Sequence, residues 1–299
     1  MHTSTQRGLL LDQVETVHLP FAIFAYWGLT LFPILVSTGL FFVYETISGH
    51  DLAIGSLVLF MVVLRQINVF TLSTLFHRSY SHRQFDYHPW VEHPLRLWNW
   101  VWMGTGGRAW AILHRWHHHR TDTPEDPHSP TKEGGSLWNV AWQTGKSYQE
   151  CLHHPERFRR YEKNLPNDWL EHAIRRLEAR GIFGLVVVRI PLMMGILVFF
   201  MPWQAALLAL PGVMGSVFFS TVITVNGFCH LVGYRTTSGA GTSTNLFPVD
   251  LLGWGEALHH NHHHRPGRAN TAIKAWEWDP GYAVLWLLSK VGLVRNLRP

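Results

Sequence analysis

Four long apolar stretches constrain the fold of this chain more than any other feature of its sequence. They span roughly residues 21–47, 53–76, 182–201 and 204–225. Each approaches or exceeds the ~20 residues that a helix needs to cross a hydrocarbon core of ~30 Å. Because lipid offers no partners for backbone groups, a helix is the only structure that such an isolated stretch can form there. The sequence therefore predicts an all-α integral membrane protein with four transmembrane helices in two hairpins.

The composition agrees with a membrane location. Charged residues make up 15% of the chain, against roughly 25% in soluble proteins, and the 15 tryptophans are of a type enriched at membrane–water interfaces. The net charge is +5, which we attribute to loops beside anionic lipid, since no nucleic-acid-binding motif is present. The two cysteines, Cys151 and Cys229, predict neither a disulfide framework nor a thiolate metal site. Residues 1–20 lack the pattern of a cleaved signal, so we predict no targeting peptide.

The distribution of lysine and arginine predicts the orientation. Residues 77–181 hold 15 of the 25 basic residues and the segment from Arg235 holds seven, whereas the hairpin turns hold none. By the positive-inside rule, both termini and the segments 77–181 and 226–299 are cytoplasmic. We expect one domain, residues 1–299, in which these two segments form a helical cap that holds a di-metal site. Arg65 interrupts the second stretch, so the helix either faces a protein-lined cavity or leaves the lipid there, which we favour.

Histidine is the outlier of the composition, with 21 residues, and its clusters lie just beyond the predicted membrane exits or in the cytoplasmic segments. Two HxxHH triplets place imidazoles at i, i+3 and i+4, positions that share one face of a helix. The triplets are His114, His117 and His118 in the central segment, and His259, His262 and His263 in the C-terminal segment. Asn226 and His230, at i and i+4, also share a face.

Spacing leaves two points open. His77 and His82 stand at i and i+5, which suits one face of a regular helix poorly, so they converge only if the helix end unwinds or bends. A second HxxHH set overlaps the last triplet by one residue, and His119 extends the central triplet. The overlapping set is His260, His263 and His264.

Nine imidazoles and one amide are too many ligands for one metal, which usually takes about four to six, so two metals are the economical interpretation. Imidazole suits iron, copper, zinc and nickel. A structural zinc site closes with four ligands and commonly includes cysteine, so the excess of histidine favours a redox-active pair. Lone histidines, His128 among them, are interpreted as structural or interfacial.

The histidine boxes resemble those of the membrane fatty-acyl desaturase family, in particular its delta-9, stearoyl-CoA-desaturase-like branch. The resemblance covers about residues 70–299 and rests on HRSYSH (77–82), HRWHH (114–118), DTPEDPHSP (122–130), NGFCHLVGYR (226–235), GEALHHNHH (255–263) and WEWDPGY (276–282). It implies an oxidoreductase that uses dioxygen and two iron ions to insert a cis double bond, at delta-9, into a long-chain fatty acyl substrate. The substrate is an acyl-CoA or an acyl-phospholipid, and the product serves unsaturated fatty acid biosynthesis.

The resemblance also implies a role for each ligand. One iron takes His77, His82, His114, His118 and His263. The other takes His117, His230, His259 and His262, with Asn226 reaching it through water. The family's third box follows a Gly-Glu pair, as Gly255 and Glu256 precede His259 here, which selects the register, although the family usually has Asn where His260 stands. Candidates to orient the imidazoles, or alternatively to cap helices or lie in solvated loops, are Asp122, Glu125, Asp126 and Glu256.

The reaction needs electrons and a place for the acyl chain. The chain has no HPGG haem motif, no Gly-rich nucleotide fingerprint and no four-cysteine cluster, so we expect a separate donor of the ferredoxin or cytochrome b5 type, with a reductase. We expect an apolar tunnel between the helices and the cap. Ile112 and Leu113 stand where animal acyl-CoA enzymes have a charged pair, which leaves room for a phospholipid-bound substrate. Possible tunnel walls, more often packing or interface anchors, are Trp98, Trp100, Trp102, Trp110, Trp116 and Trp138.

Two alternatives remain open. A di-iron hydroxylase of an alkane, a fatty acid or a carotenoid would use the same histidines, and its product, an alcohol, distinguishes it. A His-rich metal carrier or sensor would need polar groups along a path at the bilayer midplane, whereas the predicted spans contain no histidine.

Overall fold

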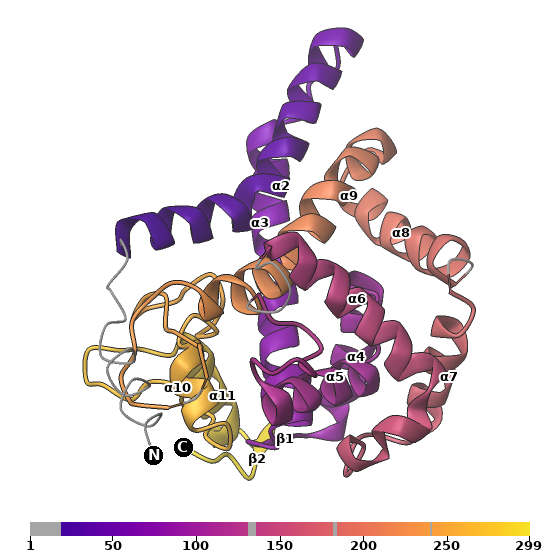
Figure 1. Ribbon diagram of the computed structural model, residues 1–299. Coiled ribbons are helices and arrows are strands. Elements are labelled where there is room, and N and C mark those ends of the chain that lie inside the picture. Colours follow the sequence, from indigo (N-terminus) through magenta and orange to yellow (C-terminus); the bar gives the residue numbers. More distant parts are fainter. Residues whose placement is uncertain (1–18, 131–135, 182–183, 240) are drawn as a thin grey trace, which may run out of the picture.

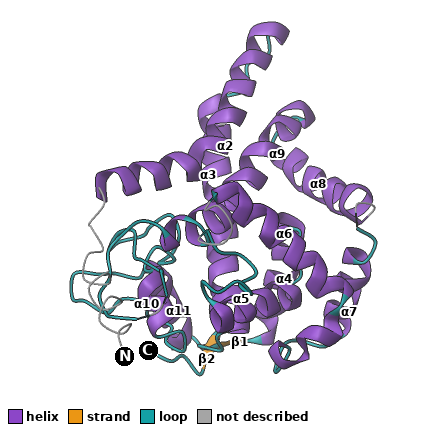
Figure 2. Cartoon of the chain, in the orientation of Figure 1, coloured by secondary structure: helices purple, strands orange, loops and turns teal. Residues whose placement is uncertain are grey.

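The computed structural model describes residues 19–130, 136–181, 184–239 and 241–299, and it is mostly helical (Figure 1). Figure 2 shows a single small strand pair beside the helices in this part of the chain. Strands β1 (Asp86–Tyr87) and β2 (Val294–Arg295) pair antiparallel, with Tyr87 opposite Val294. This pairing fastens the C-terminus to the segment that follows the first histidine box.

The helices follow one another along the chain, interrupted by π-helical and 3-10 segments. The α-helices are α2 (Leu19–Ser48), α3 (Ile54–Thr71), α4 (Pro89–Met103), α5 (Gly107–Arg120), α6 (Leu137–His153), α7 (Trp169–Glu178), α8 (Ile190–Phe200), α9 (Trp203–Phe218), α10 (His259–His264) and α11 (Pro280–Lys290). The π-helices are η1 (Leu72–Ser81), η3 (Gly184–Arg189) and η4 (Phe219–Val225). The 3-10 helices are η2 (Pro155–Tyr161) and η5 (Phe228–His230).

Several helices begin where the sequence supplies a capping side chain. Ser136, Asp168 and Asp279 each accept a hydrogen bond from a backbone N–H in the first turn of α6, α7 and α11. Such caps satisfy donors that have no partner inside the helix. Pro89 and Pro280 open α4 and α11, where a missing N–H costs nothing. Local sequence therefore fixes where these helices begin.

Three helices are long and apolar enough to cross a membrane, and they correspond to the first, second and fourth predicted stretches. They are Phe24–Ser48, Ile54–Ser81 and Trp203–His230. The third stretch forms a shorter apolar helix, Val187–Phe200, whose length of roughly 21 Å falls short of a ~30 Å core. Four full spans are thus not confirmed in the described part of the chain. Residues 182–183 of the third stretch lie outside the described residues.

The long helices pack closely where small residues meet. Gly212 of α9 donates its backbone N–H to Ser37 Oγ of α2 at 2.9 Å. A Cβ on Gly212 would lie 2.7 Å from that oxygen, and one on Gly215 would lie 2.8 Å from Pro33 Cβ. Small residues at such crossings let two backbones approach, as is common between membrane helices. On the outer faces of α2 and α3, large apolar side chains such as Phe42 and Leu59 remain exposed, as expected for surfaces that face lipid.

Arg65 shows how the second long helix continues past its polar interruption. Its side chain is fully buried, and its guanidinium donates to Leu252 O at 2.6 Å and to Ser220 Oγ at 2.7 Å. The helix runs on to Ser81, packed against the C-terminal segment. Protein groups therefore surround Arg65, as the interpretation of a protein-lined cavity expects. Beyond Arg65 the helix continues toward the histidines, as it would also do if it left the lipid there.

Candidate metal centre

Nine imidazoles from four segments of the chain converge in two adjacent groups. Within each group, one ring nitrogen of every histidine lies within 4.8 Å of those of the other members. Group one consists of His77, His82, His114, His118 and His262. Group two consists of His117, His230, His259 and His263. All nine belong to the histidine set expected from the sequence.

The expected division of the histidines between two metals is wrong at two positions. His262 Nε2 lies 2.9 Å from His77 Nε2 and 3.0 Å from His118 Nε2, in group one. His263 Nε2 lies 3.0 Å from His259 Nε2, in group two. The reason is helical geometry: His259 and His263, four residues apart, share a face of α10, whereas His262 is rotated by about 100° from His263.

A π-helix explains how His77 and His82 reach the same group. The backbone N–H of His82 donates to His77 O at 3.3 Å, a bond that spans five residues. This wider turn aligns positions i and i+5, and the two ring centroids lie 5.1 Å apart. The required departure from a regular helix is therefore an expanded turn of η1, a feature that frequently marks functional sites.

Helix α5 contributes to both groups, as α10 does. His114 and His118, at i and i+4, face group one, and His117 between them faces group two. The groups lie side by side, since the rings of His118 and His263 stack with centroids 4.2 Å apart. Each of these two helices thereby couples the positions of the two groups.

The structure also resolves the register of the last histidine box. His260 turns away from the groups, with Nε2 at 3.0 Å from Thr237 O and Nδ1 at 3.3 Å from Ser243 Oγ. His264 is exposed. His119 likewise lies apart, with Nδ1 at 3.0 Å from the hydroxyl of Tyr161. The register that begins at His259 is the one that meets the other boxes.

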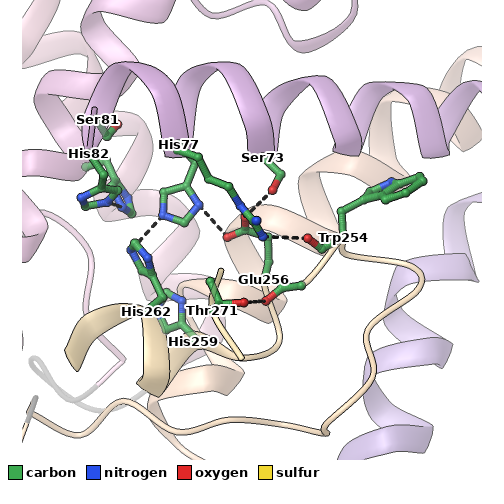
Figure 3. Close-up of polar contacts among 12 residues, drawn as sticks. Ser73, His77, Ser81, His82, Trp254, Glu256, His259, His262 and Thr271 are labelled. Atoms are coloured by element: carbon green, nitrogen blue, oxygen red, sulfur yellow. Dashed lines mark hydrogen bonds and ion pairs between the residues drawn. The ribbon is translucent and has the colours of Figure 1, made fainter. Parts of the chain in front are cut away.

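Carboxylates contact the Nδ1 atoms of several of these rings, on the side away from the centre of the group. Figure 3 shows His77 between His262 and Glu256, with Nδ1 of His77 at 2.7 Å from Glu256 Oε2. Ser73, one turn earlier in η1, donates its hydroxyl to the same carboxylate. Asp126 Oδ1 lies 2.9 Å from His117 Nδ1. These contacts point Nε2 of each ring toward the centre of its group, as in metal sites whose ligands are oriented by a carboxylate.

The other two carboxylate candidates differ from each other. Asp122 Oδ1 lies 3.4 Å from His230 Nδ1, and its other oxygen accepts the backbone N–H of Thr242 at 2.7 Å. Glu125, by contrast, is exposed and pairs with Arg120 at 2.9 Å, away from the histidines. Three of the four candidates therefore contact a ring, and Glu125 belongs to the solvated loop.

The electrostatics keep six of the rings neutral and two of the carboxylates charged. Burial, reinforced by neighbouring imidazoles, lowers the pKa of six rings well below its ordinary value: His82, His114, His118, His259, His262 and His263. Burial alone would raise the pKa of Asp126 and Glu256, but contact with His117 and His77, respectively, holds each below its ordinary value. Neutral imidazoles keep a lone pair that can bind a metal.

The donor set fits metal ions. Nitrogens of neighbouring rings lie 2.9 Å to 3.4 Å apart, too close for several unprotonated lone pairs that face one another without a cation. A metal–imidazole bond of roughly 2.1 Å would place ligands at right angles roughly 3 Å apart. Shared protons could join rings in pairs, but they could not satisfy five or four converging nitrogens. The two groups are therefore consistent with metal binding.

An apolar cavity of about 530 Å³ opens beside the groups. It reaches His77 and His114, and Asn226 at the C-terminal end of η4 also lines it. Helix α6 forms one wall from Ala141 to Gln149, roughly 12 Å along the helix axis. Of the six tryptophans considered as walls, two line it, Trp102 and Trp110. Its volume suits a small-molecule ligand.

The sequence interpretation missed the position of His128. Its side chain is 2% exposed, lines the cavity and lies against His117, with ring centroids 4.6 Å apart. Burial, with His117 nearby, lowers the pKa of His128 to about 3. The available signal was its place in DTPEDPHSP, two residues after Asp126, whose carboxylate accepts the backbone N–H of His128 at 3.0 Å.

Comparison with known proteins agrees with the family resemblance of the histidine boxes. The model of the family described as "Fatty acid desaturase" matches residues 52–278. The chain is 27% identical over 282 residues to the sn-1 stearoyl-lipid 9-desaturase of Anabaena variabilis, which covers 91% of this chain and 93% of that protein. It is 24% identical over 229 residues to the Delta-9 acyl-lipid desaturase 2 of Arabidopsis thaliana, which covers 76% of this chain and 70% of that protein.

Proposed function

Because this chain belongs to the fatty acid desaturase family, we propose that it inserts a cis double bond, at delta-9, into a long-chain fatty acyl substrate with dioxygen. The observation that carries the proposal is the convergence of nine imidazoles in two groups beside an apolar cavity. The delta-9 position is supported by the names of two similar proteins, a delta-9 acyl-lipid desaturase and a stearoyl-lipid 9-desaturase. The same names favour an acyl-lipid over an acyl-CoA as substrate.

The nine histidines would hold two iron ions, with Asn226 reaching one of them through water. Bound iron would supply the chemistry with dioxygen that breaking an unactivated C–H bond requires, which side-chain acids and bases cannot provide. The protein's own contribution is orientation: Glu256 and Asp126 fix the rings of His77 and His117 by their Nδ1 atoms.

The cavity would hold the acyl chain and exclude water from the groups. Its mostly apolar lining would pack against a hydrocarbon, so the shape of the walls would select which carbon lies beside the groups. Ile112 is buried in the apolar core, and Leu113 lines the cavity. Neither residue offers a charge for the phosphates of an acyl-CoA, which again favours an acyl-lipid.

In the membrane, the helices would form two hairpins, α2–α3 and α8–α9, that insert from the same side. Both termini and the histidine groups would then be cytoplasmic, as the basic segments require. Electrons would come from a ferredoxin or cytochrome b5 type of protein with its reductase. The products would be an unsaturated acyl chain and water.

The test is expression in cells that lack a desaturase, followed by analysis of double-bond positions in the lipids. The parent chain should yield a delta-9 alkene, and His117→Ala should abolish it while the protein still inserts, since that ring belongs to group two. His153→Ala, at an exposed position outside the groups, is the control and should retain the product. An alcohol product would instead indicate a hydroxylase, and full activity of His117→Ala would contradict the assigned site.

A further inference from the structure

The guanidinium of Arg189, the last residue of η3, is buried beside the cavity. The side chain is 8% exposed. Its Nε donates to Val101 O at 2.7 Å, and Nη2 lies 3.4 Å from Trp102 O, both at the C-terminal end of α4. Nη1 makes no hydrogen bond to a described residue, and no described carboxylate forms an ion pair with Arg189. A helix C-terminus supplies a partial charge of only about −0.5, so part of this buried charge is left uncompensated.

The guanidinium stands where two cavities adjoin. Arg189, Tyr148 and Gln149 line both the large cavity of the histidine groups and a second cavity of about 400 Å³. Gly104 leaves room for the guanidinium, because a Cβ there would collide with Nη1. An acyl chain that lies in the large cavity could therefore extend its other end past Arg189 into the second one.

The position of Arg189 along the chain places it at the level of lipid head groups. It is the third residue of the apolar helix Val187–Phe200. The preceding segment is charged, with Arg175, Arg176 and Arg180 on or just after α7. Arginines at such boundaries typically lie at the level of the membrane interface, where the phosphates of glycerolipids are found.

We propose that Arg189, with Gln149 beside it, binds the phosphate of an acyl glycerolipid whose acyl chain fills the large cavity. This inference rests on the proposed function and specifies its substrate. A guanidinium presents paired N–H donors that match a phosphate, and the contact fixes how far the acyl chain enters the cavity. Arg189 thereby helps to determine which carbon lies beside the histidine groups.

The acidic residue of the second cavity is already engaged. Glu178 Oε1 accepts hydrogen bonds from the Tyr148 hydroxyl at 2.8 Å and from the backbone N–H of Gly106. Burial raises the pKa of Glu178 to about 7, so a large share of these carboxyls is uncharged at neutral pH. Glu178 therefore orients Tyr148 and does not neutralise Arg189.

The test measures lipid binding by native mass spectrometry of the purified chain in detergent. The probes share a stearoyl chain: 1-stearoyl-lysophosphatidylglycerol, neutral monostearoylglycerol and stearoyl-CoA. Arg189→Gln should weaken binding of the phospholipid by about 10- to 100-fold, the range for a lost charge-assisted contact, and leave monostearoylglycerol within about twofold. Arg189→Lys keeps the charge without the paired donors and should show a smaller loss, below about tenfold.

The control is Arg180→Gln, which removes an exposed arginine of the same segment and should leave phospholipid binding within about twofold. The proposal is overturned if Arg189→Gln binds the phospholipid like the parent. It is equally overturned if both glycerolipids lose affinity alike, which would make Arg189 a structural cap of α4, or if the parent prefers stearoyl-CoA and Arg189→Gln removes that preference. Because no turnover is measured, absence of desaturation in cells would contradict the proposed function alone.

Discussion

The two histidine groups share helices α5 and α10 but are supported in different ways. Group one takes His77 from η1, at the end of a long apolar helix, and His82 from the position directly after η1, and its carboxylate contact is Glu256. Group two is supported by the loop after α5, where Asp126 contacts His117 and Asp122 contacts His230. One group thus depends on the geometry of a helix end, and the other on the conformation of a loop.

The loop of group two carries more than its two contacts with imidazoles. Asp126 also accepts the backbone N–H of Asp122 at 2.7 Å and that of His128 at 3.0 Å. Glu256, in contrast, is held by side chains, chiefly His77, Ser73 and Arg78. The loss of Asp126 should therefore disturb the backbone as well as a ring, whereas the loss of Glu256 should mainly release His77.

The largest effect should come from replacing either of two adjacent histidines of α10, His262 or His263, by alanine. His262→Ala should remove iron from group one, and His263→Ala should remove it from group two, so each should abolish the alkene product. Iron content of the purified variants, together with Mössbauer spectra, should show different remaining sites in the two variants. Identical spectra of the remaining iron would break the division into two groups.

The next effect should come from the carboxylates. Asp126→Asn and Glu256→Gln should each lower iron affinity about 10- to 100-fold, with the larger loss for Asp126→Asn because of its backbone contacts. Iron retention during titration with a chelator measures this. Glu125→Gln is the matched control, since Glu125 pairs with Arg120 at the surface. A loss for the control equal to that for Asp126→Asn would contradict the assignment.

Acid should destabilise the iron-free protein, and more rings of group one than of group two should contribute to this loss of stability. Four rings of group one and two of group two have a lowered pKa outside the candidate spans. The unfolded chain takes up protons on them near pH ~6.5 and the folded chain does not, so stability is present above about pH 6.5 and is lost as pH falls. Each ring contributes about 1.4 kcal/mol per pH unit to that loss.

Replacement of His118 by Asn should therefore make the pH dependence shallower by about 1.4 kcal/mol per pH unit, measured by denaturant unfolding in detergent between pH 5 and 7. His153→Asn, at an exposed position far from the groups in sequence, should leave the slope unchanged. An unchanged slope for His118→Asn would mean that this ring is protonated in the folded chain.

The smallest effect should come from Ser73→Ala. The variant removes one of the hydrogen bonds to Glu256 but leaves His77 and Arg78 in place. Iron affinity of group one should fall by less than about tenfold, and group two should be unaffected. A larger loss than for Glu256→Gln would show that Ser73 acts on the group by another route.

Much of this was predictable because the signals are local. Apolar length marked the three candidate spans, and i, i+3, i+4 spacing marked both histidine triplets. The third apolar stretch was predicted to end before Pro202, as α8 does, but composition did not reveal that the π-helix η3 precedes α8, and a full span is not confirmed there. The family resemblance is confirmed by the family match over residues 52–278.

The sequence by itself determined which residues can bind metal and which helices can lie in lipid, because helical periodicity and hydrophobicity are properties of neighbouring residues. The tertiary structure alone decided which group His262 joins, that an expanded turn aligns His77 with His82, and that Arg189 is buried without a full counter-charge. The place of His262 and the burial of Arg189 depend on contacts between segments more than 80 residues apart, such as Arg189 with Val101, which no local pattern encodes.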